Sequence, residues 1–73
     1  MTAERVTNNI RRLRFEHGEM TQAELAERAD VSRQTINAME AGDYNPSLIL
    51  ALRIARIFGV AVEEVFNYEP GKE

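Results

Sequence analysis

Two signals for the start of a helix lie so close together in this chain that almost no loop fits between the helices they open. Thr21-Gln22-Ala23-Glu24 is a capping box, in which the Thr21 hydroxyl accepts from the Glu24 amide and the Glu24 side chain reaches back. Ser32 is a favourable N-cap for the next helix. The connection is centred on Asp30-Val31, and a turn this short sets the second helix across the first.

The side chains around this turn suit two helices that cross at close range. Ala26 is small where the helices must approach, and Val31 and Ile36 fill the angle between them. Met39 also faces inward, and Gly42 suits the left-handed position that follows the last turn of the second helix. The crossing pair therefore occupies residues of about 21–41.

Apolar residues recur at helical spacing through most of the remaining chain. Val6, Ile10 and Leu13 predict a first helix over residues 6–17. Residues 48–58 form a further helix that is apolar nearly all round, which is typical of a central helix or of one that also meets a partner. One face of this helix is expected to hold Leu48, Leu52, Ala55 and Phe58.

These elements, with a short last helix over residues 62–67, predict an all-α fold. We expect residues 1–73 to form a single domain, a compact five-helix bundle in which the crossing pair supplies helices two and three. Residues 3–6 and 67–69 are the segments that suit a small antiparallel strand pair.

Composition excludes several classes of site. The 73 residues contain no cysteine, which excludes a disulfide framework and a thiolate zinc site, and the one histidine, His17, argues against a Ser/His/Asp hydrolase. We expect no metal, no cofactor, no small-molecule ligand and no enzymatic activity, because a bundle this small has little room for a polar pocket. Arg53 and Arg56 interrupt the longest apolar stretch, so we expect no membrane span, and the expected location is the cytoplasm.

The net charge of −3 at first argues against a nucleic-acid partner. The charge is polarised, however, because residues 1–14 carry four arginines against Glu4, whereas residues 63–73 carry four glutamates against Lys72. Phosphate binding depends on the local face rather than on the sum. The acidic net charge therefore does not exclude a DNA-binding face.

The segment QAELAERADVSRQTINAMEAGD, residues 22–43, has the pattern of a helix-turn-helix, which presents its second helix to the major groove. With SRQTI, E-x-G and YNPS, the stretch TQAELAERADVSRQTINAMEAGDYNPSLILALRIA resembles the Xre family of regulators, the group of the lambda, 434 and Cro repressors. The resemblance runs from about Ile10 to Phe66. Within the family it is closest to short stand-alone dimeric repressors, such as that of a bacterial cytolysin operon.

The resemblance implies a role for each matching residue. Arg33, Gln34 and Asn37 are expected to point outward and read bases, since arginine pairs with guanine O6/N7 and glutamine or asparagine with adenine N6/N7. Helix starts and the following loop are expected to hold the DNA backbone. The full set of implied DNA contacts is Gln22, Ser32, Arg33, Gln34, Thr35, Asn37, Tyr44 and Asn45.

Four other positions are interpreted from the same resemblance. Arg14 and Glu40 match a structural ion pair between helices one and three. Asp30 stands where the family usually has glycine, at the left-handed residue of the turn, and aspartate tolerates that conformation less well than glycine. Leu48 stands where some members carry an arginine for the minor groove, a contact that this chain then lacks.

We therefore interpret the chain as a sequence-specific DNA-binding transcriptional regulator, a repressor that binds a palindromic operator as a homodimer. Two-fold pairing spaces two recognition helices about 34–36 Å apart on one face of the DNA. The dimer seam is expected in the last helix and tail, residues 60–70, with the end of the helix before them. Its residues are Ile57, Val60, Val62, Val65, Phe66 and Tyr68, and the resemblance implies a strand pair between residues 3–6 and 67–69.

Two alternatives keep the fold and change the function. The same fold serves antitoxins and controllers of restriction–modification operons, although only about residues 70–73 are spare for a toxin-binding segment. A protein-interaction module that no longer binds DNA is the other alternative. Arg33, Gln34 and Asn37 argue against it, because they are side chains that pair with bases.

Overall fold

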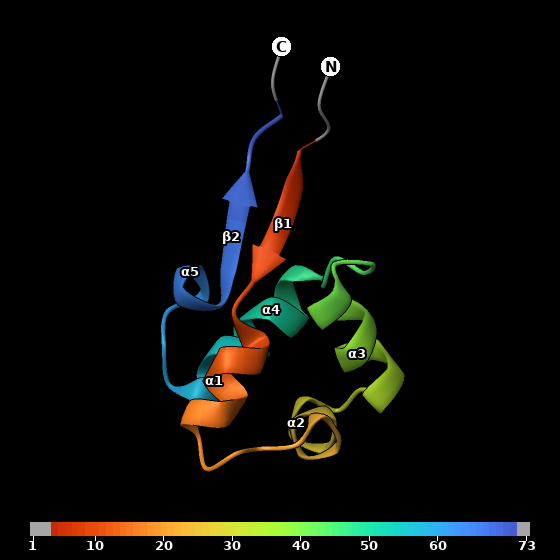
Figure 1. Ribbon diagram of the computed structural model, residues 1–73, viewed down its shortest axis with the longest axis vertical. Coiled ribbons are helices and arrows are strands. Elements are labelled where there is room, and N and C mark those ends of the chain that lie inside the picture. Colours follow the sequence, from red (N-terminus) through yellow and green to blue (C-terminus); the bar gives the residue numbers. More distant parts are fainter. Residues whose placement is uncertain (1–3, 72–73) are drawn as a thin grey trace.

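The computed structural model describes residues 4–71 and forms five helices and one pair of strands. Figure 1 shows how the helices gather into one body from which the two strands extend. In chain order the elements are β1 (Arg5–Asn8), α1 (Ile10–Glu16), α2 (Gln22–Ala29), α3 (Arg33–Ala41), α4 (Leu48–Phe58), α5 (Val62–Val65) and β2 (Phe66–Glu69). The expected five-helix fold with a small antiparallel strand pair is confirmed.

Every helix contributes side chains to a single core. α2 and α3 pack against one another, and α4 packs against α2 and α5. The buried apolar residues are Ile10, Leu13, Met20, Leu25, Ala26, Ala29, Ile36, Met39, Leu50, Ile54, Ala55, Phe58 and Val65. Ala26, at 4% exposure, is buried on α2, as expected for a small residue at a close helix crossing.

Local capping sets where α2 and α3 begin and how the chain turns between them. The Glu24 amide donates to Thr21 Oγ1 and the Thr21 amide donates to Glu24 Oε1, both at 3.0 Å, so the capping box is confirmed. These two contacts also lower the pKa of Glu24, the backbone bond from Thr21 most. The Ser32 side chain accepts from the Thr35 amide and starts α3. Asp30 has φ 59° and ψ 45°, the left-handed conformation expected there.

The first helix begins later than its apolar spacing predicts. Residues 5–8 are a strand, and α1 starts at Ile10, whose amide donates to Asn8 Oδ1 at 3.1 Å. Val6 therefore belongs to β1 and not to a helix face. The reason is non-local, since β1 gains a complete strand partner from a segment near the other end of the chain.

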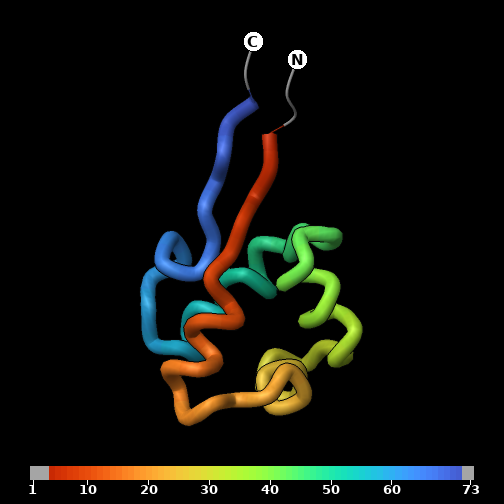
Figure 2. Tube along the Cα trace, in the orientation of Figure 1, coloured from red at the N-terminus to blue at the C-terminus, as the bar shows by residue number. Residues whose placement is uncertain are grey.

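The strand pair forms a ribbon that extends away from the helices, as Figure 2 shows. β1 and β2 are antiparallel, with Arg5 opposite Glu69 and Asn8 opposite Phe66. The pairing lies further along the chain than the expected residues 3–6, of which residue 3 lies outside the described part. The last helix correspondingly ends at Val65 rather than at residue 67, because Phe66 and Asn67 are extended.

The inner face of α4 also differs from the expected one. α4 has the predicted bounds, but it buries Leu50, Ile54, Ala55 and Phe58. Leu48 and Leu52, expected on the inner face, are 73% and 50% exposed. A helix that is apolar nearly all round has no polar stripe to mark its outer side, so its spacing alone did not distinguish the two faces.

Replacement of Asp30 by glycine is expected to stabilise the protein by about 0.5–1 kcal/mol. Glycine removes the left-handed strain of an L-residue and the unfavourable negative charge at the end of α2, at the cost of a more flexible unfolded chain. The midpoint of urea unfolding should rise without a change in the m-value. Gly42→Ala is the matched control, since Gly42 also lies at positive φ, 84°, and should lose stability. A lower midpoint for Asp30→Gly would contradict the assigned turn.

Candidate nucleic-acid interface

The outward face of α3 carries exposed side chains, of which Asn37 also contacts Gln22 at the start of α2. Arg33, Gln34 and Asn37 are exposed, while Ile36 and Met39 on the opposite side are buried. The ion pairs within residues 4–71 are Arg5–Glu69, Arg12–Glu16 and Arg14–Glu40, so the charge of Arg33 has no partner there. These three side chains are presented together on one regular element, as the sequence predicts.

Ser32 and Thr35 act first of all within the protein. The Ser32 hydroxyl accepts from the Thr35 amide at 3.1 Å and lies 3.0 Å from the Thr35 hydroxyl. The two hydroxyls thus lie together at the start of α3. One of these hydroxyls donates to the other, so one hydroxyl hydrogen remains that can donate to a phosphate oxygen.

A nearly buried ion pair holds α3 against α1. Arg14 Nε donates to Glu40 Oε2 at 2.7 Å and Arg14 Nη2 donates to Glu40 Oε1 at 3.0 Å. Arg14 Nη1 donates to the carbonyl of Met20 at 2.8 Å, which ties in the connection between α1 and α2. The two side chains are 12% and 11% exposed. A two-pronged contact of this kind sets both distance and orientation.

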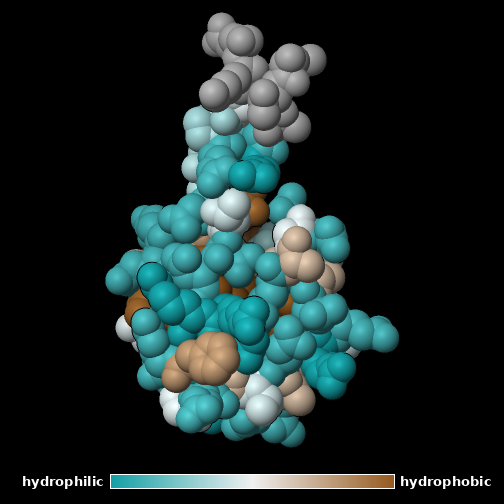
Figure 3. Space-filling model, viewed as in Figure 1, coloured by the Kyte–Doolittle hydropathy of each residue, from teal (hydrophilic) through white to brown (hydrophobic). Residues whose placement is uncertain are grey.

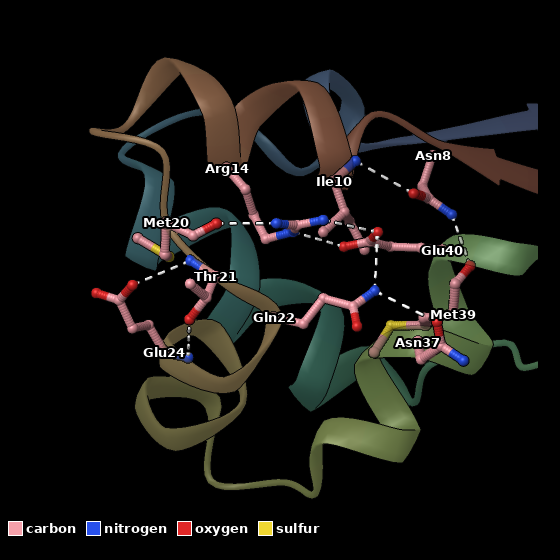
Figure 4. Close-up of polar contacts among 10 residues, drawn as sticks. All are labelled: Asn8, Ile10, Arg14, Met20, Thr21, Gln22, Glu24, Asn37, Met39 and Glu40. Carbon is pink, nitrogen blue, oxygen red and sulfur yellow. Dashed lines mark hydrogen bonds and ion pairs between the residues drawn. The ribbon is translucent and has the colours of Figure 1, made fainter.

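Gln22 joins the start of α2 to the same cluster. Figure 4 shows its side chain lying between Glu40 and Asn37. Gln22 Nε2 is 3.2 Å from Glu40 Oε1 and 3.4 Å from Asn37 Oδ1. The Glu24 and Leu25 amides are taken by Thr21, which leaves the backbone amides of Gln22 and Ala23 as the free donors at the start of α2.

Tyr44 and Asn45 lie in the loop that follows α3. Both are exposed, Tyr44 by 45%. The loop begins with a helix cap, in which Gly42 has φ 84° and the Asp43 amide donates to the carbonyl of Ala38 at 2.9 Å. The start of α2 and this loop are thus the two segments next to α3 that carry implied backbone contacts.

A hydrophilic, hollowed surface lies beside Gln22 and Asn37. Figure 3 shows it to be largely hydrophilic over α1 and α3. A cleft of about 820 Å³ opens between the two helices, lined by Arg11, Arg12, Gln22 and Asn37 among others. Sequence reasoning placed Arg11 and Arg12 in a basic segment but assigned them no site. Arg11 lies 6.0 Å above the ring of Phe15, which keeps the guanidinium along α1.

The expected dimer residues do not all lie at the surface. Val65 is 0% exposed and packs in the core of its own chain, so it cannot contact another molecule, and its assignment to the seam is wrong. Ile57, Val60, Val62 and Phe66 are partly buried against the core. Tyr68 is 63% exposed, and its hydroxyl donates to Glu4 Oε1 at 2.8 Å, which raises the pKa of Tyr68.

A continuous apolar surface lies beside two of these residues. Leu48, Ile49 and Leu52 are 73%, 69% and 50% exposed on α4. Ile49 and Leu52 share a cleft of about 510 Å³ with Val60 and Val62. We refer to these five residues as the α4–α5 apolar surface. Sequence reasoning grouped Leu48 and Leu52 on one face with Ala55 and Phe58, and it named Leu48 as a lost DNA contact. The signal that could have revealed this surface is that α4 is apolar nearly all round.

Three polar side chains missed from the sequence bind helix ends. Asn8 Nδ2 donates to the carbonyl of Met39 at 2.8 Å, and Arg53 Nη1 donates to that of Ala29 at 2.5 Å. The two ring nitrogens of His17 lie 2.8 and 2.9 Å from the carbonyls of Leu13 and Phe58. Apart from the contact between His17 and Leu13, four positions apart, these contacts join residues 24 to 41 positions apart, which no local pattern marks. They brace the helices that carry the interface.

No helix within residues 4–71 has the length and apolar character needed to cross a membrane.

Comparison with known proteins identifies the class that this fold and interface define. A helix-turn-helix family model matches residues 10–65, from the start of α1 to the end of α5. That match covers well over half of the chain, and the chain belongs to this helix-turn-helix family.

Curated relatives share much of the sequence. An uncharacterized HTH-type transcriptional regulator of Methanocaldococcus jannaschii is 50% identical over 62 residues, which cover 85% of this chain and 92% of the relative. Another, of Methanothermobacter thermautotrophicus, is 59% identical over 58 residues, 78% of this chain and 83% of the relative.

Solved structures share the fold. A putative DNA-binding protein from Bacteroides fragilis superposes with a TM-score of 0.75 at 26% identity, over 85% of this chain and 98% of that one. The restriction-modification controller protein C.AhdI from Aeromonas hydrophila has a TM-score of 0.69 at 29% identity, over 75% and 82%. Both carry the arrangement of helices described above.

Removal of one partner of the Arg14–Glu40 pair should destabilise the fold markedly. Glu40→Gln leaves the nearly buried Arg14 guanidinium without a counter-charge, at an expected cost of about 2–3 kcal/mol in the free energy of unfolding. Urea denaturation followed by circular dichroism measures this. Glu16→Gln is the control, because the Arg12–Glu16 pair is 63% and 56% exposed at 3.7 Å and should contribute little. Equal effects of the two changes would contradict the bracing role of Glu40.

Proposed function

We propose that this protein is a transcriptional regulator, a repressor, that binds a palindromic operator as a homodimer with α3 in the major groove. The observation that carries the proposal is the outward face of α3, where Arg33, Gln34 and Asn37 stand without a covering element on a helix braced by a nearly buried ion pair. A rigid helix with exposed base-pairing side chains is the usual reader of a major groove.

Each side chain on this face has a chemical partner on a base edge. Arg33, in the first turn, suits the two acceptors of guanine, O6 and N7. Gln34 offers both a donor and an acceptor, which suits adenine. Thr35 adds a hydroxyl for phosphate and a methyl group for thymine. Together these contacts would distinguish one DNA sequence from another, whereas most of the affinity for any duplex comes from contacts to phosphate.

The segments beside α3 supply contacts to the DNA backbone. The free backbone amides of Gln22 and Ala23 point out of the start of α2, where the helix dipole favours a phosphate. The exposed Tyr44 and Asn45 serve the same purpose from the loop after α3. Phosphate contacts on both sides of α3, from the start of α2 and from the loop after α3, set the register of α3 on the duplex.

The α4–α5 apolar surface supports the homodimer. Three large apolar side chains at 50% exposure or more are costly to leave in water, and such contiguous patches usually mark an interaction site. Ile49 and Leu52 share a cleft with Val60 and Val62, and these two valines belong to the seam predicted from the sequence. A second copy related by a two-fold axis would cover the patch on both chains with the same residues.

Arg33→Ala tests the base-reading role of α3. Operator duplexes are first selected from a random library and the site is located by footprinting on the DNA upstream of the gene. The substitution should then cost about 1–3 kcal/mol in binding and relax the preference at one base pair in each half-site. Arg28→Ala, which removes an exposed arginine from the last turn of α2, should preserve the preference. A uniform loss over all sequences would make Arg33 a phosphate contact instead.

Ile49→Asp tests the dimer surface. A charge in the middle of the α4–α5 apolar surface should yield folded monomers in sedimentation equilibrium and weaken operator binding, because two half-sites are no longer held by one particle. Phe15→Asp changes another exposed large apolar residue, 55% exposed on α1, so the dimer should persist. Val65→Asp should unfold the chain, since Val65 is fully buried. An unchanged dimer for Ile49→Asp would exclude this surface.

A further inference from the structure

The ion pair of Arg14 and Glu40 continues into a chain of polar contacts that ends on the recognition face. Arg14 holds both oxygens of Glu40, Glu40 Oε1 also contacts Gln22, and Gln22 contacts Asn37. Exposure rises along this chain, from 12% and 11% for the ion pair, through the half-buried Gln22, to the exposed Asn37. Figure 4 shows the whole series within one cluster.

The chemistry of this series sets which way each amide group faces. An ionised carboxylate only accepts hydrogen bonds, so the Gln22 atom that faces Glu40 must be the nitrogen Nε2. The same nitrogen has a second hydrogen, and it lies 3.4 Å from the Asn37 side chain. The Asn37 atom at that point must therefore be the acceptor, Oδ1. The charge of Arg14 thus dictates, through two intermediates, the orientation of an amide on the protein surface.

We propose that Gln22 is a positioning residue that turns the Asn37 side chain so that its NH₂ group faces the DNA. In Figure 4 the nitrogen of Asn37 lies on the side of the amide away from Gln22. Both side-chain hydrogens of Gln22 are used within the protein. The phosphate contact at the start of α2 then belongs to the backbone amides of Gln22 and Ala23.

This orientation makes Asn37 a donor in base recognition. An unrestrained asparagine pairs with adenine through both its oxygen and its nitrogen. With Oδ1 held by Gln22, Asn37 suits bases that offer acceptors in the major groove, namely guanine, adenine N7 and thymine O4, and it disfavours cytosine, which offers only a donor. The inference rests on the proposed function and assigns a base preference to one position of the half-site.

The test uses duplexes selected by the wild-type protein from a random library. The position read by Asn37 is the one whose preference Asn37→Ala removes, and all four base pairs are then placed there. Wild type should bind the duplex with cytosine facing Asn37 about tenfold or more weakly than the best one. Gln22→Leu keeps a side chain of similar size but removes the hydrogen-bond donor. The ratio of binding between the best duplex and the cytosine duplex should then fall below about threefold, while the preference at the Arg33 position persists.

Two controls separate positioning from a structural role. Thr21→Ala weakens the N-cap of α2, and it should lower stability and leave the base preference at the Asn37 position intact. In the Asn37→Ala background, Gln22→Leu should have no further effect on base preference. A Gln22→Leu protein that binds all four duplexes equally more weakly than wild type, with the same ratios, would overturn the proposal.

A measurement on the free wild-type protein tests the same contact without DNA. Nitrogen relaxation of side-chain amides should show the NH₂ group of Asn37 to be more ordered than that of Asn67, which is exposed on a regular element without a Gln22-like neighbour. Equal mobility of the two groups would overturn the inference even if the protein binds its operator. A wild-type protein that selects no sequence at all, with an ordered Asn37, would instead count against the proposed function.

Discussion

The nearly buried ion pair between Arg14 and Glu40 is the interaction on which the arrangement of the interface depends. It joins α1 to α3 through two hydrogen bonds, and the third bond of Arg14, to the Met20 carbonyl, holds the connection to α2. A pair of this kind contributes little net stability compared with apolar packing, but the loss of one partner is costly. Its main effect is therefore on geometry. Glu40 lies one turn from Asn37 on α3, so the residue that anchors the helix inside also orients a side chain outside.

The small size of the chain explains why so many helix ends are satisfied by specific side chains. A chain of 73 residues buries a modest share of its surface, so the free-energy cost of one unsatisfied amide or carbonyl would be a large fraction of its stability. Thr21, Ser32 and Ser47 cap the starts of α2, α3 and α4, and Arg53 and His17 bind carbonyls at helix ends. The apolar side chains on the outer side of α4 remain exposed to solvent, which is unfavourable. A second copy that covers them would add stability that the single chain lacks.

The parts of this structure that could be predicted from the sequence are those set by neighbouring residues. The capping box at Thr21, the left-handed Asp30 and the bounds of α4 depend on contacts within a few positions, and all three are confirmed. The strand pair joins Arg5 to Glu69, 64 positions apart, so its register is decided by tertiary pairing and was predicted only roughly. Val65 was misplaced because a helix of four residues has no periodicity that separates an inner from an outer face. The contact between Gln22 and Asn37 depends on how closely α2 and α3 approach each other. The sequence predicts that these helices cross, but it does not give the distances between their side chains.

The acidic total of the chain is compatible with this interface because affinity and discrimination come from different contacts. A strongly basic protein binds any duplex through phosphate charge, and its preference for one sequence is then a small difference between large terms. Here the net charge is −3, and the arginines that border the recognition face, Arg11, Arg12 and Arg33, are few. Non-specific binding should accordingly be weak. In such a protein the orientation of a single amide, set by a chain of hydrogen bonds that starts at a nearly buried ion pair, carries a larger share of the choice between sequences.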